Sequence, residues 1–135
     1  MQETKRVVLT WEEGRRFTGG APEGPKATID GENGVAPGPM VTLLLAAASC
    51  SGSDVVVILQ KMRVPLGRLR IEVTGVRREQ EPRRYIAIHF DYHLGGEGVD
   101  QAKATRAIDL SLEKYCSVIH SLAPDIAITY ALTLA

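Results

Sequence analysis

Apolar residues recur at every second position in several segments of the chain, which is the period of a half-buried β-strand. The alternation is clearest around Ile71, Ile88 and Ile128. It predicts three strands, over 69–74, 84–94 and 126–134. Shorter alternating patterns near the N-terminus predict three more strands, over 6–12, 15–19 and 27–30. Glu13 and Gly14 offer a turn between the first two of these.

A long apolar run occupies residues 40–59 and exceeds the usual length of a strand. Pro39 suits the first turn of a helix, where its missing N–H costs nothing, and Pro65 can end one. We therefore predict a helix over 39–63. Asp54 interrupts the run, and a carboxylate in the middle of a membrane span is costly. The pattern thus favours a helix buried inside protein on most of its sides, and we expect no membrane association.

Mixed apolar and charged positions predict two further helices, over 99–110 and 111–122, with Pro124 after the second. The order of elements favours an α+β fold of one domain, residues 1–135, in which antiparallel sheets pack on a long buried central helix. A helix that is apolar nearly all round is hard to bury in one small domain. We therefore expect a homodimer that forms around this helix.

Composition and charge narrow the function classes. The chain has 135 residues, 44% of them hydrophobic, which is enough for a real core. Sixteen basic and sixteen acidic residues cancel, and aromatic residues make up 5%, so neither charge nor base stacking favours a nucleic-acid partner. The N-terminus lacks the apolar segment of a signal peptide. The expected location is the cytoplasm, where thiols are kept reduced.

Two cysteines, Cys50 in the long apolar run and Cys116 in the second short helix, are the candidate nucleophiles. They are too few for a disulfide scaffold, which leaves free core thiols or a reversible redox pair. The thiolate is the reactive form and needs a nearby positive group. Asp54, one turn after Cys50, would oppose a thiolate, so a reactive site needs an arginine. The candidates for this role are Arg15, Arg16 and Arg106.

The sequence favours neither a metal nor an organic cofactor, and we predict none. Cys116 and His120 share one helical face and could join Cys50 around zinc. However, the local spacing that is typical of zinc sites is missing. No glycine-rich segment stands between a strand and a helix, as a phosphate loop requires.

The segment PMVTLLLAAASCSGSDVVVIL resembles the central-helix motif of the OsmC/Ohr family, the osmotically inducible and organic hydroperoxide resistance proteins. The segment LSLEKYCSVIHSL resembles the second cysteine motif of the same family, in the form typical of its OsmC-like branch. The order of strands agrees, and the resemblance extends over nearly the whole chain. It implies an intertwined homodimer with two sites near the subunit interface.

The resemblance also implies a thiol-dependent peroxidase of the oxidative stress response that reduces organic hydroperoxides. Carried over, Cys50 becomes a sulfenic acid and Cys116 resolves it as an intramolecular disulfide, which a dithiol reductant then reduces. The family's arginine corresponds to Arg15 or Arg16. The family's glutamate at the start of the central helix has no counterpart in Met40-Val41-Thr42. Two alternatives keep the fold: a dithiol protein that binds a small thiol or acyl metabolite, and a structural dimer with inert cysteines.

Overall fold

The computed structural model describes all 135 residues, which divide into two compact units, residues 1–43 and residues 44–135. The first unit carries an antiparallel sheet in the order β1-β2-β3. Its strands are β1 (Val8–Glu13), β2 (Arg16–Gly20) and β3 (Ala27–Asp30). The three predicted strands are thus confirmed, with shifts of at most two residues. Gly14 adopts a φ of 55° in the turn between β1 and β2, where a side chain would be strained.

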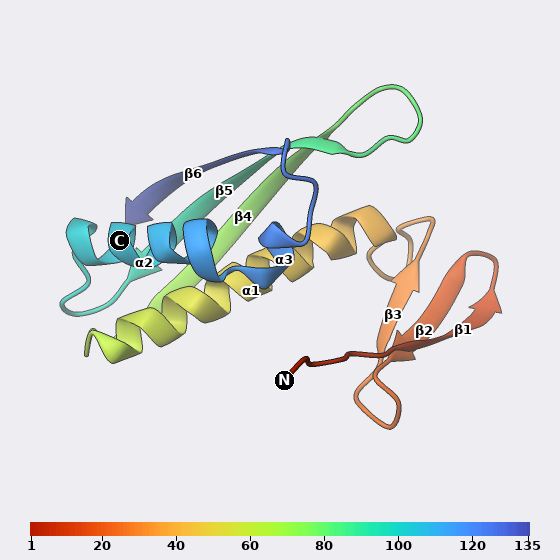
Figure 1. Ribbon diagram of the computed structural model, residues 1–135, viewed down its shortest axis with the longest axis horizontal. Helices are drawn as coiled ribbons and strands as arrows, with labels where there is room; N and C mark the ends of the chain where they lie inside the picture. The colour runs from red at the N-terminus through yellow and green to blue at the C-terminus, as the bar shows by residue number, and fades with distance from the viewer. The chain divides into compact units, whose positions relative to one another are not determined.

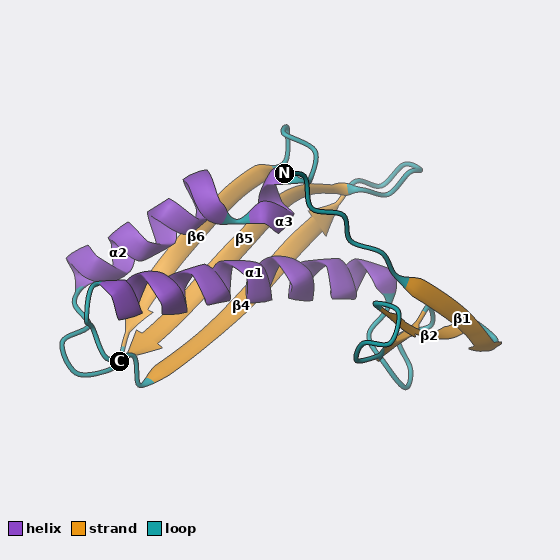
Figure 2. Ribbon diagram, turned by 60° about the horizontal axis from the view of Figure 1, so that its bottom comes forward, coloured by secondary structure: helices purple, strands orange, loops and turns teal.

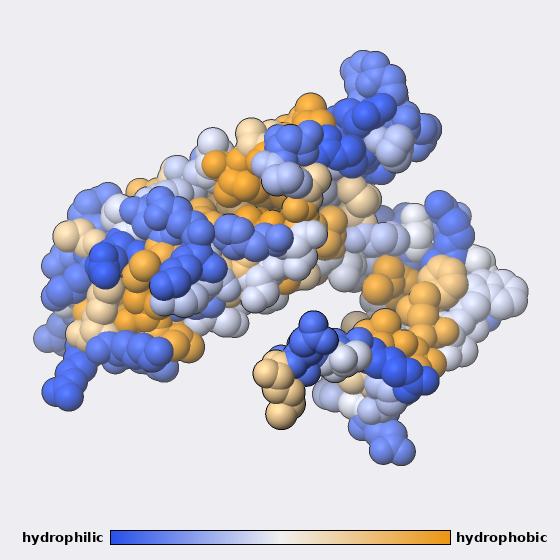
Figure 3. All heavy atoms as spheres, in the orientation of Figure 1, coloured by the Kyte–Doolittle hydropathy of each residue, from blue (hydrophilic) through white to orange (hydrophobic).

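The sheet of the first unit leaves large hydrophobic side chains at its surface. Leu9 and Trp11 are both exposed, although the Trp11 indole N–H donates a hydrogen bond to the Gly14 carbonyl at 2.9 Å. Figure 3 shows hydrophobic atoms gathered on this unit. Exposed apolar surface of this kind is typical of a surface that another chain covers.

The long apolar run forms helix α1 (Pro39–Lys61), two residues shorter at its end than predicted. The chain leaves the helix through Arg63, whose φ is 61°, just before Pro65. In the second unit α1 lies along one face of a three-stranded sheet, together with a second helix, as Figure 2 shows. Gly52 lets α1 approach this sheet closely, because a Cβ there would lie 3.2 Å from Cδ1 of Ile71.

The sheet of the second unit has the order β4-β5-β6, which places β5 in the centre (Figure 1). Its strands are β4 (Arg68–Arg77), β5 (Tyr85–Gly95) and β6 (Ala127–Leu134), which confirms the remaining predicted strands. Alternate residues of β5 point into the core beneath the helices, and four of them are fully buried: Ile88, Phe90, Tyr92 and Leu94. The predicted α+β class is therefore confirmed.

The prediction of purely antiparallel sheets is wrong for the last strand, since β6 pairs with β5 in parallel. Parallel neighbours need a crossover connection, and here the chain crosses over the sheet through helices. The connecting elements are α2 (Gln101–Leu110), the π-helical turn η1 (Ser111–Tyr115) and α3 (Ser117–His120). This crossover carries the second cysteine back over the face of the sheet on which α1 lies.

Within the single chain α1 buries one face only, so the prediction of a helix buried on most sides is wrong for this chain alone. The buried positions are Ala47, Ser51, Gly52, Val55 and Leu59. On another face, Leu45 is 53% exposed and Val57 is 45% exposed. By length and composition α1 could also span a membrane, a test that the core helices of soluble proteins pass as well.

Candidate functional site

The second unit brings the two cysteines together. Cys50 lies on α1 and is partly exposed, whereas Cys116 lies in the crossover and has an exposed fraction of 0%. Both are free thiols, and they lie close enough that the Cys50 thiol raises the pKa of Cys116. The fold therefore brings a thiol from the middle of the chain close to one from near its end.

Cys116 occupies a break between two helical segments, so the prediction of one continuous helix over 111–122 is wrong at this residue. Its φ and ψ are −70° and 95°, which is extended backbone. The Cys116 N–H donates to the carbonyl of Ser111 at 2.7 Å, closing the wide turn of η1. The Cys116 carbonyl then accepts from the His120 N–H at 3.1 Å and begins α3. Hydrogen bonds on both sides hold the residue in place.

Burial raises the pKa of the Cys116 thiol from its ordinary value of 9.0 to about 11. A hydrogen bond with the backbone of Ile119 acts in the opposite direction, while the Cys50 thiol and the negative charge of Asp54 raise this pKa further. Asp54 therefore opposes a thiolate at Cys116, whereas the sequence predicts this effect at Cys50. At neutral pH Cys116 is a protonated thiol.

A chain of buried hydroxyl groups runs beside the two thiols. The Ser51 hydroxyl lies 2.6 Å from the Tyr92 hydroxyl and 2.8 Å from the Ser111 hydroxyl. The Ser111 hydroxyl donates to Oδ2 of Asp54 at 2.9 Å. Sequence reasoning missed this chain, because Ser51 and Ser111 are 60 positions apart and neither belongs to a recognisable polar motif. The one available signal is that Ser51 follows Cys50 directly within an apolar run.

The candidate arginines lie in different units. Arg15 and Arg16 belong to the first unit, where Arg15 pairs with Glu32 and Arg16 with Glu13, each at 3.9 Å. Both side chains are therefore engaged by local carboxylates. Arg106 belongs to the second unit, on α2.

A pocket of about 490 Å³ opens beside Asp54, between the end of α1 and the crossover. Lys61 and Arg106 stand at this pocket, and neither takes part in an ion pair. Its other lining residues are mostly apolar: Ser53, Val57, Ile58, Met62, Leu110 and Tyr115. A mostly apolar pocket with a few charged groups is typical of a site for a small organic molecule.

The zinc arrangement that the spacing of Cys116 and His120 allowed does not form. Nε2 of His120 lies 3.1 Å from the carbonyl oxygen of Leu112 and is taken up by that contact. No group of three or more histidine, cysteine or acidic side chains converges anywhere in the chain.

A cysteine on a long helix that meets a second cysteine in a helical crossover, on this α+β scaffold, defines a two-cysteine protein of the OsmC type. The family model described as "OsmC-like protein" matches residues 31–131, and the chain belongs to that family. The resemblance seen in the two cysteine segments is thus confirmed at the level of the family.

Similar proteins extend over nearly the whole chain. Protein YhfA of Escherichia coli K12 is 40% identical over 124 residues, which cover 91% of this chain and 92% of that protein. A solved structure of a hypothetical protein from Aquifex aeolicus is 32% identical, covers 99% of both chains and has a TM-score of 0.86. The organic hydroperoxide resistance protein OhrB of Bacillus subtilis shares the fold at 14% identity, with a TM-score of 0.63 and coverage of 97% and 98%.

Proposed function

We propose that this chain is a thiol-dependent peroxidase that reduces organic hydroperoxides with Cys50 and Cys116. The observation that carries the proposal is the contact between a partly exposed thiol and a fully buried one. A peroxide needs access to the first thiol, whereas the second thiol needs only to reach the first. The unlike exposure of the two supports Cys50 as the peroxidatic residue and Cys116 as the resolving residue.

The proposed cycle uses both thiols in turn. The Cys50 sulfur attacks the peroxide, so that an S–O bond forms, the O–O bond breaks and the alcohol leaves with a proton. The Cys116 sulfur then attacks the Cys50 sulfur, and the hydroxide leaves with the Cys116 proton as water. A dithiol reductant restores both thiols. The proposed location is the cytoplasm, where such reductants keep dithiols reduced.

The activating charge in this proposal comes from Arg15 or Arg16. Each already contacts a carboxylate at 3.9 Å, which weakens the positive charge it can offer to a thiolate. The residues at the start of α1 include no acid that could hold such an arginine in place. We therefore expect slower turnover than in the well-studied branch of the family.

The experiment compares the serine variants of the two cysteines in a peroxide consumption assay, with a monothiol and a dithiol reductant side by side. Cys50→Ser should not react even once, because the nucleophile is gone. Cys116→Ser should react once and then stall or over-oxidise, because the sulfenic acid has no partner. Full activity in Cys50→Ser, or no peroxide consumption by the wild type with any dithiol, would contradict the proposal.

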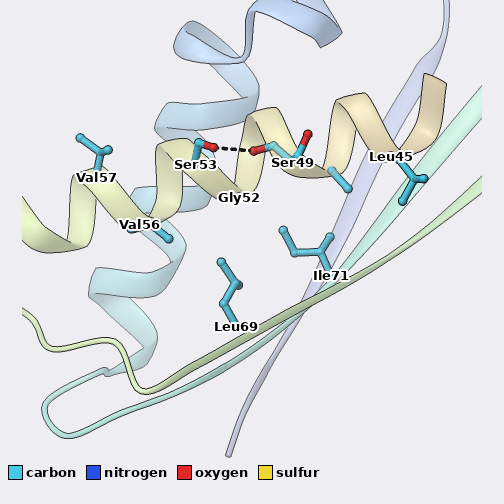
Figure 4. A pocket seen from close by; sticks show the side chains of 9 residues that line it. Leu45, Ser49, Gly52, Ser53, Val56, Val57, Leu69 and Ile71 are labelled. Carbon is cyan, nitrogen blue, oxygen red and sulfur yellow. Dashed lines mark hydrogen bonds between the residues drawn. The ribbon is translucent and has the colours of Figure 1, made fainter. Parts of the chain in front are cut away.

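A second copy of the chain is the proposed macromolecular partner. A groove of about 610 Å³ runs along the exposed face of α1 and is lined by apolar groups of the helix and of β4. Figure 4 shows Leu45, Val57 and Ile71 at this groove. Apolar surface of this extent supports a homodimer. Light scattering at micromolar concentration tests it, and a monomer would contradict it.

The pocket beside Asp54 favours the alternative function, in which a dithiol protein of this fold binds a small thiol or acyl metabolite. Its apolar walls suit an acyl chain, and the unpaired cations Lys61 and Arg106 suit an anionic group. Binding of such a compound by wild-type protein that consumes no peroxide would favour this alternative over the peroxidase.

A further inference from the structure

Ser111 connects the two cysteine segments through two different groups. Its carbonyl accepts the Cys116 N–H at 2.7 Å, and its hydroxyl donates to Asp54 on α1 at 2.9 Å. Asp54 lies one turn after Cys50 on that helix. Ser111 itself has an exposed fraction of 0%, whereas Asp54 is half-buried. A single buried residue thus ties the turn that holds the second thiol to the helix that holds the first.

The direction of the hydroxyl chain strengthens this tie. A serine hydroxyl has one hydrogen, and that of Ser111 goes to Asp54. Ser51 must therefore donate to Ser111, and Tyr92 must donate to Ser51. Every hydroxyl hydrogen is used, and no buried side-chain nitrogen or oxygen lacks a partner. Ser51 follows Cys50 directly, and Asp54 lies one turn after Cys50. Both residues are bonded to Ser111, so Ser111 holds the turn of α1 that contains Cys50.

We propose that Ser111 is a positioning residue of the dithiol, which holds the Cys116 turn against α1 so that the two sulfurs can form a disulfide. This inference rests on the proposed function for the use of that disulfide. Ser111 contributes no atom to the reaction. In the resolving step the S–S bond forms, the S–O bond of the sulfenic acid breaks, and the Cys116 proton leaves in water. Holding two reacting groups in place raises their effective concentration.

The test measures the equilibrium between the dithiol and its disulfide in mixtures of reduced and oxidised glutathione, and it needs no peroxide. Ser111→Ala should lower the effective concentration of one thiol at the other by about tenfold or more, which corresponds to about 30 mV. Ser121→Ala is the matched control. Its hydroxyl is exposed and donates to the carbonyl of Ser117 at 2.8 Å, so it takes no part in the bonds of Ser111. We therefore expect the effective concentration to change by no more than about twofold.

Two variants of Asp54 separate the link from the charge. Asp54→Ala breaks the same link from the side of α1 and should reproduce the loss. Asp54→Asn removes the charge but keeps an oxygen that accepts from Ser111, and should stay close to the wild type. If Ser111→Ala does not fold, these two Asp54 variants still test whether the bond between Ser111 and Asp54 positions the dithiol.

Two results would overturn the assignment of Ser111. One is a folded Ser111→Ala protein with the wild-type equilibrium. The other is an Asp54→Asn protein that loses as much as Asp54→Ala, because the charge and not the link would then be responsible. Wild-type protein that closes the disulfide in glutathione but consumes no peroxide contradicts the peroxidase alone and leaves the positioning role intact.

Discussion

The direction of the hydroxyl chain makes an unusual prediction for stability. Tyr92 donates its hydrogen to Ser51, so Tyr92→Phe removes a donor and leaves Ser51 free to donate to Ser111 as before. No buried hydrogen loses its acceptor in this variant. Ser51→Ala is different, because the buried hydroxyl of Tyr92 then keeps its hydrogen without an acceptor. We therefore expect Ser51→Ala to be clearly more destabilising than Tyr92→Phe.

The magnitudes follow from the number of bonds lost and the number of donors left unpaired. One internal hydrogen bond contributes about 0.5–1.5 kcal/mol net, so Tyr92→Phe should lower the free energy of unfolding by about 1 kcal/mol. Ser51→Ala loses two bonds and leaves a buried donor unpaired, which alone costs about 1–3 kcal/mol, for an expected total of about 3 kcal/mol. The double variant should be no worse than Ser51→Ala alone, since Phe has no hydroxyl to leave unpaired.

Urea unfolding of the reduced protein at pH 7 measures these differences. The protein concentration is held fixed, because the stability of the proposed dimer would depend on it. Ser121 is an exposed serine that does not belong to the row of buried hydroxyl groups. Ser121→Ala should therefore change the free energy of unfolding by less than about 0.5 kcal/mol. The proposed direction of the hydroxyl hydrogen bonds is refuted if Tyr92→Phe lowers the free energy of unfolding as much as Ser51→Ala. Full additivity in the double variant would refute it equally.

Four further predictions concern the thiols, the core and the interface. The folded chain keeps the Cys116 proton up to a pKa of about 11, so the free energy of unfolding should fall by about 2 kcal/mol as pH rises from about 9 to about 11, and Cys116→Ser should lack this part of the fall. Asp54→Asn should lower the pKa of Cys116, seen as thiolate ultraviolet absorbance at lower pH, and an unchanged titration would exclude the charge effect. Leu59→Ala should cost about 2–5 kcal/mol in urea unfolding, since Leu59 is fully buried; a smaller loss would mean that the site collapses. Val57→Glu should shift the proposed dimer toward monomer in light scattering, because it places a charge on the exposed face of α1. A dimer of unchanged stability would show that Val57 does not belong to the interface.

The pattern of apolar positions alone was enough to place most elements of this fold. A strand with one buried face must alternate apolar and polar residues. The strands β4, β5 and β6 can therefore be predicted without any knowledge of their neighbours. The long helix can be predicted because its apolar run is longer than a strand, and Pro39 marks its start. The two cysteine segments also identify the family from sequence, because their residues are contiguous. Local chemistry therefore suffices for the elements and the candidate thiols.

The tertiary structure decided what depends on residues far apart in the chain. Whether β6 runs parallel to β5 depends on where the crossover delivers the chain, and alternation within β6 is the same in either direction. The break at Cys116 replaces a predicted helix because the π-helical turn bonds this residue to Ser111. The contact between Cys50 and Cys116, and the hydroxyl chain beside it, need two segments that meet only after packing. Hydrogen bonds and burial between such segments leave no period in the sequence, since each partner is chosen by the fold and not by its neighbours along the chain.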